Sequence, residues 1–364
     1  MRTHWKRLNG PQRIAGVDLA RGLAIIGMFA AHLLVTPETW LWSDPGTWLS
    51  IVDGRSSILF ATLAGVSIGL VTGGRSPLAP ALMSGARQRL MVRAAALFIL
   101  GILLVLTGVP VFVILPAYAI LFFLALPFTA LSARAVLCSA VVIAVVMPFV
   151  QPWLNSLDIW ADPLGEELSA VLGWNYPFTL WIAFVLGGLG IARSGVTRLV
   201  VQVRMLVVGA VLAVIGYSLA ELPPPASGEY WYLVWSAAPH SSGLLEVIGT
   251  GGFVIAVLAA CLLICRLDLV KTVSFPLRAT GAMPLTAYTA QLLVWAIIAL
   301  LVTGDTADLY AFRALDPFWP LTLAILAACT LWSLFIGRGP LEWALERASR
   351  IVPSATGRVG RLEG

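Results

Sequence analysis

Three ionisable residues, Asp18, Arg21 and His32, lie within the first long apolar segment, 14-IAGVDLARGLAIIGMFAAHLL-34. Such side chains are costly in hydrocarbon, so in a spanning helix they face a bundle interior or a water-filled cavity. Arg21 and His32 are eleven residues apart, which places them on nearly the same helix face, about 16 Å apart along the axis. An imidazole held in this way is suited to general-base catalysis or to proton transfer.

Asp18 precedes Arg21 by one helical turn, so the two side chains are expected to form an ion pair. The alternative for this pair is a purely structural role. The alternative for His32 is a hydrogen-bonded residue of the core, without a part in any chemistry.

A second polar group opens the next apolar run, 53-DGRSSILFATLAGVSIGL-70, with Asp53 and Arg55. These residues are expected at about the depth of His32, on a helix that crosses in the opposite direction. A carboxylate beside an imidazole fixes its tautomer and raises its basicity. The sequence therefore predicts a His32–Asp53 contact, with Arg55 available to stabilise an oxyanion. The alternative is that Asp53 caps its helix and Arg55 extends to the surface.

Two later segments supply further polar groups. In 239-PHSSGLLEVIG-249, His240 lies at the mouth of a helix and Glu246 about 9 Å farther along it. An unpaired glutamate at that depth would be costly, so we expect both residues to bind an acceptor, or one to replace His32 as base. His240 alone is equally well explained as a surface residue. In 281-GAMPLTAYTAQLLVW-295, Tyr288 and Gln291 are uncharged polar groups at mid-depth.

A basic group, Arg87, Arg89 and Arg93, opens the apolar run after residue 86. Arginines of this kind bind phosphates through paired hydrogen bonds, although charge that merely sets topology would look the same. The four cysteines lie in apolar segments without histidine or acidic partners, so the sequence predicts no metal site.

The elements that must position these residues are membrane-spanning helices. The 364 residues are 59% hydrophobic and only 11% charged, which excludes a soluble domain and indicates an all-α polytopic membrane protein. Runs of about 20 apolar residues predict a bundle of about ten spans. Their expected ranges are 15–36, 48–72, 90–108, 111–131, 134–151, 177–193, 199–220, 243–265, 281–303 and 318–337.

Charge placement predicts the orientation of the spans. With both termini cytoplasmic, basic residues concentrate in the inner segments and most acidic residues in the outer loops, where Arg313 is the one basic residue. We therefore expect a multi-pass protein of the plasma (inner) membrane. Residues 1–13 form a basic N-terminus, 14–337 the transmembrane domain and 338–364 an amphipathic cytoplasmic tail. The net charge of +5 follows from this topology and requires no nucleic-acid partner.

The stretch RIAGVDLARGLAIIGMFAAHLL resembles the first helix of the transmembrane acyltransferase superfamily, whose hallmark is an arginine and a histidine separated by ten residues. Its D-x-x-R-G-x-A opening is similar to the heparan-alpha-glucosaminide N-acetyltransferases and their bacterial YeiB-like relatives. Further segments resemble the YeiB-like branch, so that the resemblance covers about residues 13–300. These segments are DGRSSILFATLAGVS, VILPAYAILFFLALP, YPFTLWIAFVLGGLGIAR and GAMPLTAYTAQLL.

The resemblance implies a ten- or eleven-helix bundle that moves an acyl group, usually acetyl from acetyl-CoA, onto a sugar hydroxyl or amine. It makes Arg21 and His32 the hallmark pair, with His32 as the expected base. The acceptor would be a cell-envelope glycan or an amino sugar outside the membrane, and a homodimer is an open expectation. The rival hypothesis is a proton-coupled transporter of a small anionic solute. In the enzyme, cofactor binding would involve Arg21, Arg87, Arg89, Arg93, Tyr288 and Gln291.

Overall fold

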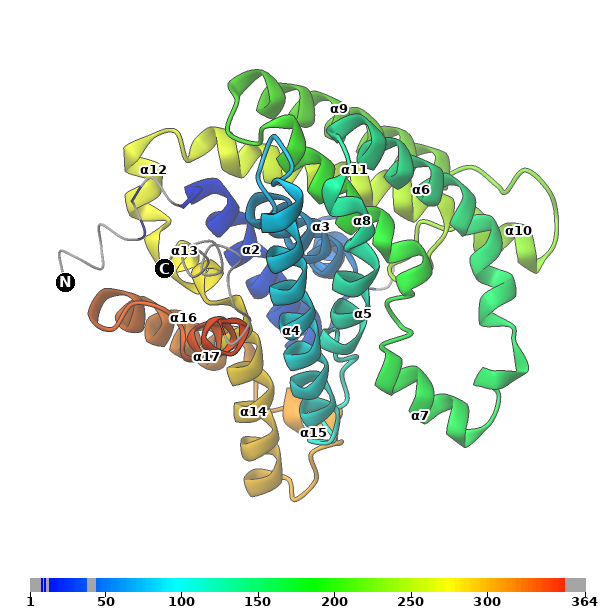
Figure 1. Cartoon of the computed structure of the whole chain (residues 1–364). Coiled ribbons are helices and arrows are strands. Elements are labelled where there is room, and N and C mark those ends of the chain that lie inside the picture. Colours follow the sequence, from blue (N-terminus) through cyan, green and yellow to red (C-terminus); the bar gives the residue numbers. More distant parts are fainter. Residues whose placement is uncertain (1–7, 9, 11–12, 38–43, 351–364) are drawn as a thin grey trace. The chain divides into compact units, whose positions relative to one another are not determined.

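The computed structural model describes residues 8, 10, 13–37 and 44–350, and the chain in that part is built of helices (Figure 1). Among the described residues, eight helices are long and apolar enough to cross a membrane, and two shorter apolar helices accompany them. The all-α polytopic class is therefore confirmed. The orientation of the termini stays a prediction, and most of the predicted N-terminal segment and the end of the predicted tail lie outside the described residues.

The ten predicted spans correspond one by one to apolar helices. The helix for the span predicted from residue 90 begins earlier, at Pro80. The predicted span 48–72 begins within a 3-10 helix, η1, and continues in α3. The bounds are α2 Ala15–Leu33, η1 Pro45–Val52, α3 Arg55–Val71, α4 Pro80–Val105, α5 Leu115–Ala125, α6 Ala133–Asn155, α8 Phe178–Ser194, α9 Leu199–Ala220, α11 Leu244–Ile264, α14 Pro284–Val302 and α16 Phe318–Phe335.

Shorter elements connect these helices. One of them, α7, lies between α6 and α8. The bounds are η2 Pro127–Ala130, η3 Asp158–Trp160, α7 Pro163–Leu172, α10 Glu229–Val234, α12 Asp268–Val273, α13 Phe275–Ala282, α15 Leu309–Arg313 and α17 Pro340–Ser349.

The predicted span 281–303 is interrupted near its start. Its first residues belong to α13, and Met283 separates that helix from α14, which begins at Pro284. Proline lacks the N–H of a helix interior, so a new helix starts there. Glu342 of α17 covers this start, because its carboxylate accepts from the N–H groups of Leu285 (2.7 Å) and Thr286 (3.1 Å). A carboxylate at a helix N-terminus complements the positive end of the helix dipole.

The chain divides into two compact units. The first comprises residues 1–60, 103–113 and 199–342, and the second comprises 61–102, 114–198 and 343–364. In the first unit α2 packs against α11, α13, α14 and α16, while α9 packs along α11. In the second unit α8 packs against α5 and α6.

The helices of the first unit approach each other closely where glycines remove side chains. A Cβ atom on Gly22 of α2 would overlap the backbone oxygen of Leu277, and one on Gly281 of α13 would overlap the backbone oxygen of Asp18. The two backbones are thus in direct contact, as in small-residue helix crossings of other membrane proteins.

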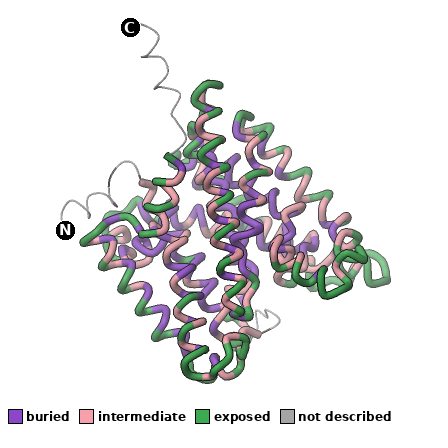
Figure 2. The backbone as a smooth tube through the Cα atoms, turned by 60° about the horizontal axis from the view of Figure 1, so that its bottom comes forward, coloured by how far each residue is buried: buried purple, intermediate pink, exposed green. Residues whose placement is uncertain are grey.

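Large apolar side chains remain exposed along several helices, which is expected where lipid is the solvent. Exposed residues also occupy the connecting loops (Figure 2). Helix α9 carries a long row of such side chains: Val200, Val203, Val207, Val208, Val211, Val214 and Ile215.

Candidate active site

His32 lies in the last turn of α2, against α14. Its Nδ1 is 3.3 Å from the side-chain amide of the fully buried Gln291. The ring of Tyr288, one turn earlier on α14, has its centroid 6.4 Å from that of the imidazole. Sequence reasoning predicted Tyr288 and Gln291 as cofactor contacts, and the structure places both beside the histidine. The Gln291 amide therefore fixes the orientation of the His32 ring.

Asp53 follows η1 and contacts a different imidazole from the predicted one. Its Oδ1 lies 3.7 Å from Nε2 of His240, whereas the ring of His32 is held by Gln291. The predicted direct contact between His32 and Asp53 is therefore replaced by an Asp53–His240 pair. Helix η1, which Asp53 follows, packs against α2, and a Cβ atom on Gly27 of α2 would meet the side chain of Ser56. The Asp53–His240 pair therefore lies beside the helix that carries His32.

The loop that carries His240 is held by Glu246. Its Oε1 accepts from the N–H of His240, and its Oε2 accepts from the N–H of Ser242, both at 2.7 Å. His240 and Ser242 have φ of 60° and 59°, a left-handed conformation that is uncommon for residues other than glycine. Glu246 is only 3% exposed. Its carboxylate therefore stabilises the loop, and its binding of an acceptor stays a prediction.

Gly54 brings the Asp53 turn against the His240 loop. It has a φ of 65°, and a Cβ atom added there would lie 3.1 Å from Cβ of Pro239. A glycine is favoured at this position both by the backbone conformation and by the close approach of the two segments. The local chain geometry thus pairs Asp53 with His240.

Arg55 begins α3 and is buried beside α9 of the same unit. Its Nε donates to the hydroxyl of Tyr217 at 2.7 Å, and its Nη1 donates to the backbone oxygen of Ser50 at 3.0 Å. The guanidinium also lies 4.9 Å from the centroid of the Tyr217 ring. Arg55 therefore does not extend to the surface. Sequence reasoning did not single out Tyr217, because no spacing rule links it to Arg55.

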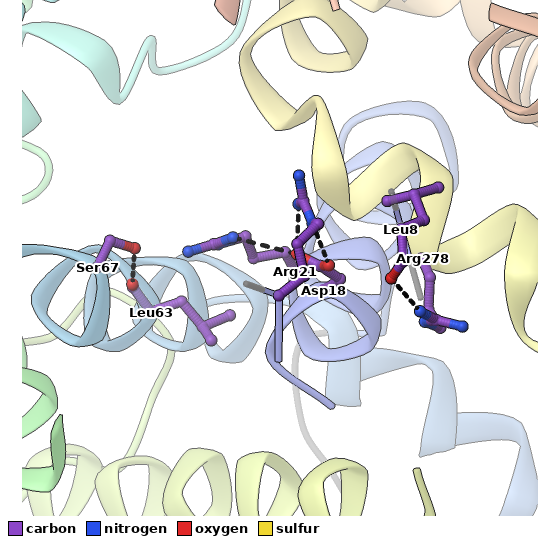
Figure 3. A network of polar contacts seen from close by, with 7 residues as sticks. Leu8, Asp18, Arg21, Leu63, Ser67 and Arg278 are labelled. Atoms are coloured by element: carbon purple, nitrogen blue, oxygen red, sulfur yellow. Dashed lines mark hydrogen bonds and ion pairs between the residues drawn. The ribbon is translucent and has the colours of Figure 1, made fainter. Parts of the chain in front are cut away.

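The predicted Asp18–Arg21 ion pair is confirmed and has a third member. Nη1 of Arg21 lies 3.4 Å from Oδ1 of Asp18, and Arg13 donates to both carboxylate oxygens at 2.7 and 2.8 Å. Figure 3 shows Arg21 directed toward Asp18 in this network. The same figure shows Arg278, which is fully buried and donates to the backbone oxygen of Leu8 at 2.8 Å.

The three arginines of α4 lie on more than one side of the helix. Arg87 and Arg89 are two residues apart, so their side chains leave the helix on different sides. Nε of Arg87 donates to Oγ1 of Thr129 at 2.9 Å, whereas Arg89 is exposed and Arg93 is partly buried. Arg193, expected only as positive inner charge, donates to four backbone oxygens and one hydroxyl of the same unit.

Arg313, the one basic residue of the predicted outer loops, contacts the end of the histidine helix. Its Nη2 and Nε donate to the backbone oxygen of His32 at 3.0 and 3.3 Å. Burial lowers the pKa of this guanidinium, which still remains charged at neutral pH. In the sequence, Arg313 stood out because it is the one basic residue among the acidic residues of the predicted outer loops.

Comparison with known families adds an independent observation. The model described as heparan-alpha-glucosaminide N-acetyltransferase, catalytic, matches residues 13–220, more than half of the chain. The chain belongs to this family. A second model, described as a protein of unknown function (DUF418), matches residues 193–351. The searches of curated proteins and of solved structures return no match.

The heparan-alpha-glucosaminide N-acetyltransferase family supports a membrane acetyltransferase activity for the chain. The segment matched by its catalytic model contains His32 and Asp53. Their partners Gln291 and His240 come from the segment matched by the second model. The site of the first unit is thus built from both matched segments.

Proposed function

We propose that the protein transfers an acetyl group from acetyl-CoA to a hydroxyl or amine of a cell-envelope glycan or amino sugar outside the plasma membrane. We assign the chemistry to the site formed by His32, Asp53, His240 and Gln291. The observation that carries this proposal is the presence of two imidazoles with different partners, a carboxylate and an amide, in one site of a chain from this family.

We assign the base to His240, because its Nε2 lies 3.7 Å from the Asp53 carboxylate, which can orient the ring for proton transfer. His240 takes the proton of the acceptor hydroxyl or amine as its oxygen or nitrogen attacks the thioester carbonyl. When the carbon–sulfur bond breaks, the proton passes to the sulfur, and an ester or amide and free CoA result.

His32 has a complementary role in this proposal. Because Gln291 fixes its ring, the imidazole can present an N–H to the carbonyl oxygen on which negative charge develops. Arg55 is already bonded to Tyr217 and Ser50, so we assign it to holding the Asp53 turn. We retain Arg21 and Tyr288 of the first unit as proposed contacts of the donor. The phosphate-binding role of Arg87, Arg89 and Arg93, which belong to the second unit, stays a prediction from the sequence.

Glutamine substitutions separate the two histidine roles, because a glutamine side chain donates a hydrogen bond but does not accept a proton at neutral pH. His240→Gln is expected to lower the rate of CoA release by about 10²–10⁴-fold, the usual contribution of a general base. His32→Gln keeps a donor and is expected to lose about 10-fold or less. The measurement is release of free CoA from acetyl-CoA by purified protein in detergent, with amino-sugar and glycan acceptors.

Equal activity of both variants and the unsubstituted protein would rule out this site as the active site. Uptake of an unmodified solute into proteoliposomes, without release of CoA, would instead support the transporter hypothesis.

A further inference from the structure

The short helix α15 contacts both helices that form the His32–Gln291 pair. Toward α2, Arg313 donates to the backbone oxygen of His32 (3.0 and 3.3 Å) and to that of Ala31 (3.5 Å). The last carbonyl groups of a helix have no partners within it, and a cation there is favourable. Arg313 therefore fixes the end of α2 at the residue that carries the imidazole.

Toward α14, the contact is aromatic. Phe312 stacks on Trp295, with ring centroids 4.8 Å apart and planes 9° from parallel, and both side chains are fully buried. Trp295 lies one helical turn after Gln291 on α14. Asp308 caps α15 by accepting from the N–H of Ala311 at 2.8 Å, which keeps the short helix formed. Neighbouring residues of one short helix thus hold α2 and α14 at the depth of the site.

We propose that α15 is a strap that sets the position of the His32 ring against Gln291, with Arg313 as a positioning residue. This inference rests on the proposed function in one respect, because it assumes that His32 takes part in the reaction. A carbonyl-bound arginine acts on the ring through the backbone of the same residue. Small displacements of a catalytic group cost up to about 10²-fold in rate, so loss of the strap reduces turnover without removing any reacting group.

The first test is kinetic and uses Arg313→Gln, Arg313→Lys and the control Lys271→Gln. Lys271 is a cation of the same unit, outside the site and paired with the exposed Asp268 at 2.8 Å. Arg313→Gln is expected to lower kcat by about 10-fold with both KM values nearly unchanged, and Arg313→Lys to restore part of the loss. Lys271→Gln is expected to match the unsubstituted protein.

A double-substitution cycle distinguishes positioning from general stability. If Arg313 acts through His32, Arg313→Gln has little further effect in a His32→Gln background. Independent, multiplying losses would overturn the strap. If His240→Gln and His32→Gln show their expected losses but Arg313→Gln matches Lys271→Gln, the inference alone fails. If neither histidine matters, the proposed function fails.

The second test needs no activity. Diethyl pyrocarbonate modifies imidazole nitrogens, and peptide mass spectrometry resolves His32 from His4 and His240. We expect His32 to react several-fold faster in Arg313→Gln than in Lys271→Gln, because the ring loses its fixed place against Gln291. Phe312→Leu should shift the rate in the same direction. Unchanged His32 reactivity in both variants would overturn the strap whatever the enzyme does.

Discussion

Glu246 is an acidic residue within an apolar helix, and its surroundings explain why it is tolerated there. A buried carboxylate without partners would cost several kcal/mol. Here both oxygens accept backbone N–H groups of the loop that carries His240. The carboxylate therefore stabilises the backbone of His240 and Ser242, both of which have positive φ. In this way Glu246 orients the imidazole of His240.

Substitution of Glu246 tests this interpretation. Glu246→Gln replaces one acceptor oxygen by an NH₂ group that faces a backbone N–H, so a buried donor loses its partner at a cost of about 1–3 kcal/mol. We expect a loss of kcat larger than any change in the KM for acetyl-CoA, measured by CoA release. Glu246→Asp keeps the charge and should retain more activity. A Glu246→Gln enzyme with normal kcat would contradict the assignment.

The sequence allowed the residues of the candidate site to be predicted, but not which of them contact each other. Positions of His32, Asp53, His240 and Gln291 follow from searching apolar helices for polar side chains. The pairing of Asp53 with His240 depends on two turns with positive φ, at Gly54 and at the His240 loop. No helical spacing rule describes such turns. Sequence reasoning therefore chose His32 as the partner, since only depth could be estimated.

At the scale of elements, the crossing of α2 and α13 fixes the base of the histidine helix. Glycines on both helices bring the backbones into contact near Asp18, the centre of the arginine network. Periodicity and length predicted the long helices well. They did not predict the break at Met283, because the apolar pattern continues through it.

The crossing predicts a strong effect of adding one methyl group. Gly281→Ala would force the Cβ against the backbone oxygen of Asp18, and overpacking of this kind costs about 1–3 kcal/mol. A thermal unfolding scan in detergent should show a lower Tm for this variant. Gly187→Ala on α8 is the matched control, because a Cβ there meets nothing within 4 Å. Equal Tm values for the two variants would show that α2 and α13 can separate to accommodate the added methyl group, and would contradict the prediction.

At the scale of the whole molecule, charge and hydropathy carried most of the prediction. The number of apolar helices and their order along the chain follow from the lengths and positions of the apolar runs, since lipid leaves helices as the way to satisfy the backbone. The packing of helices within each unit depends on how their side chains fit together, which cannot be predicted from hydropathy and charge. The side of the membrane on which each loop lies is predicted from arginine placement.

Cysteine labelling tests the predicted orientation. In a protein whose native cysteines are replaced by alanine, Ser76→Cys would lie in a predicted inner turn and Ser227→Cys in a predicted outer loop. We expect a membrane-impermeant maleimide to label Ser227→Cys in intact cells and Ser76→Cys only after permeabilisation. The reverse pattern would invert the topology and place the histidine site on the cytoplasmic side.

The contact of Glu342 with the first turn of α14 links α17 to the proposed site. Gln291 lies two turns along the helix that Glu342 covers, so α17 helps to hold the residue that orients His32. Chimaeras between relatives therefore cannot exchange α17 freely. A chimaera fused just before residue 340 needs an acidic side chain at the position of Glu342 that fits the first turn of the other protein's α14. This requirement restricts which members of the family can recombine at that point.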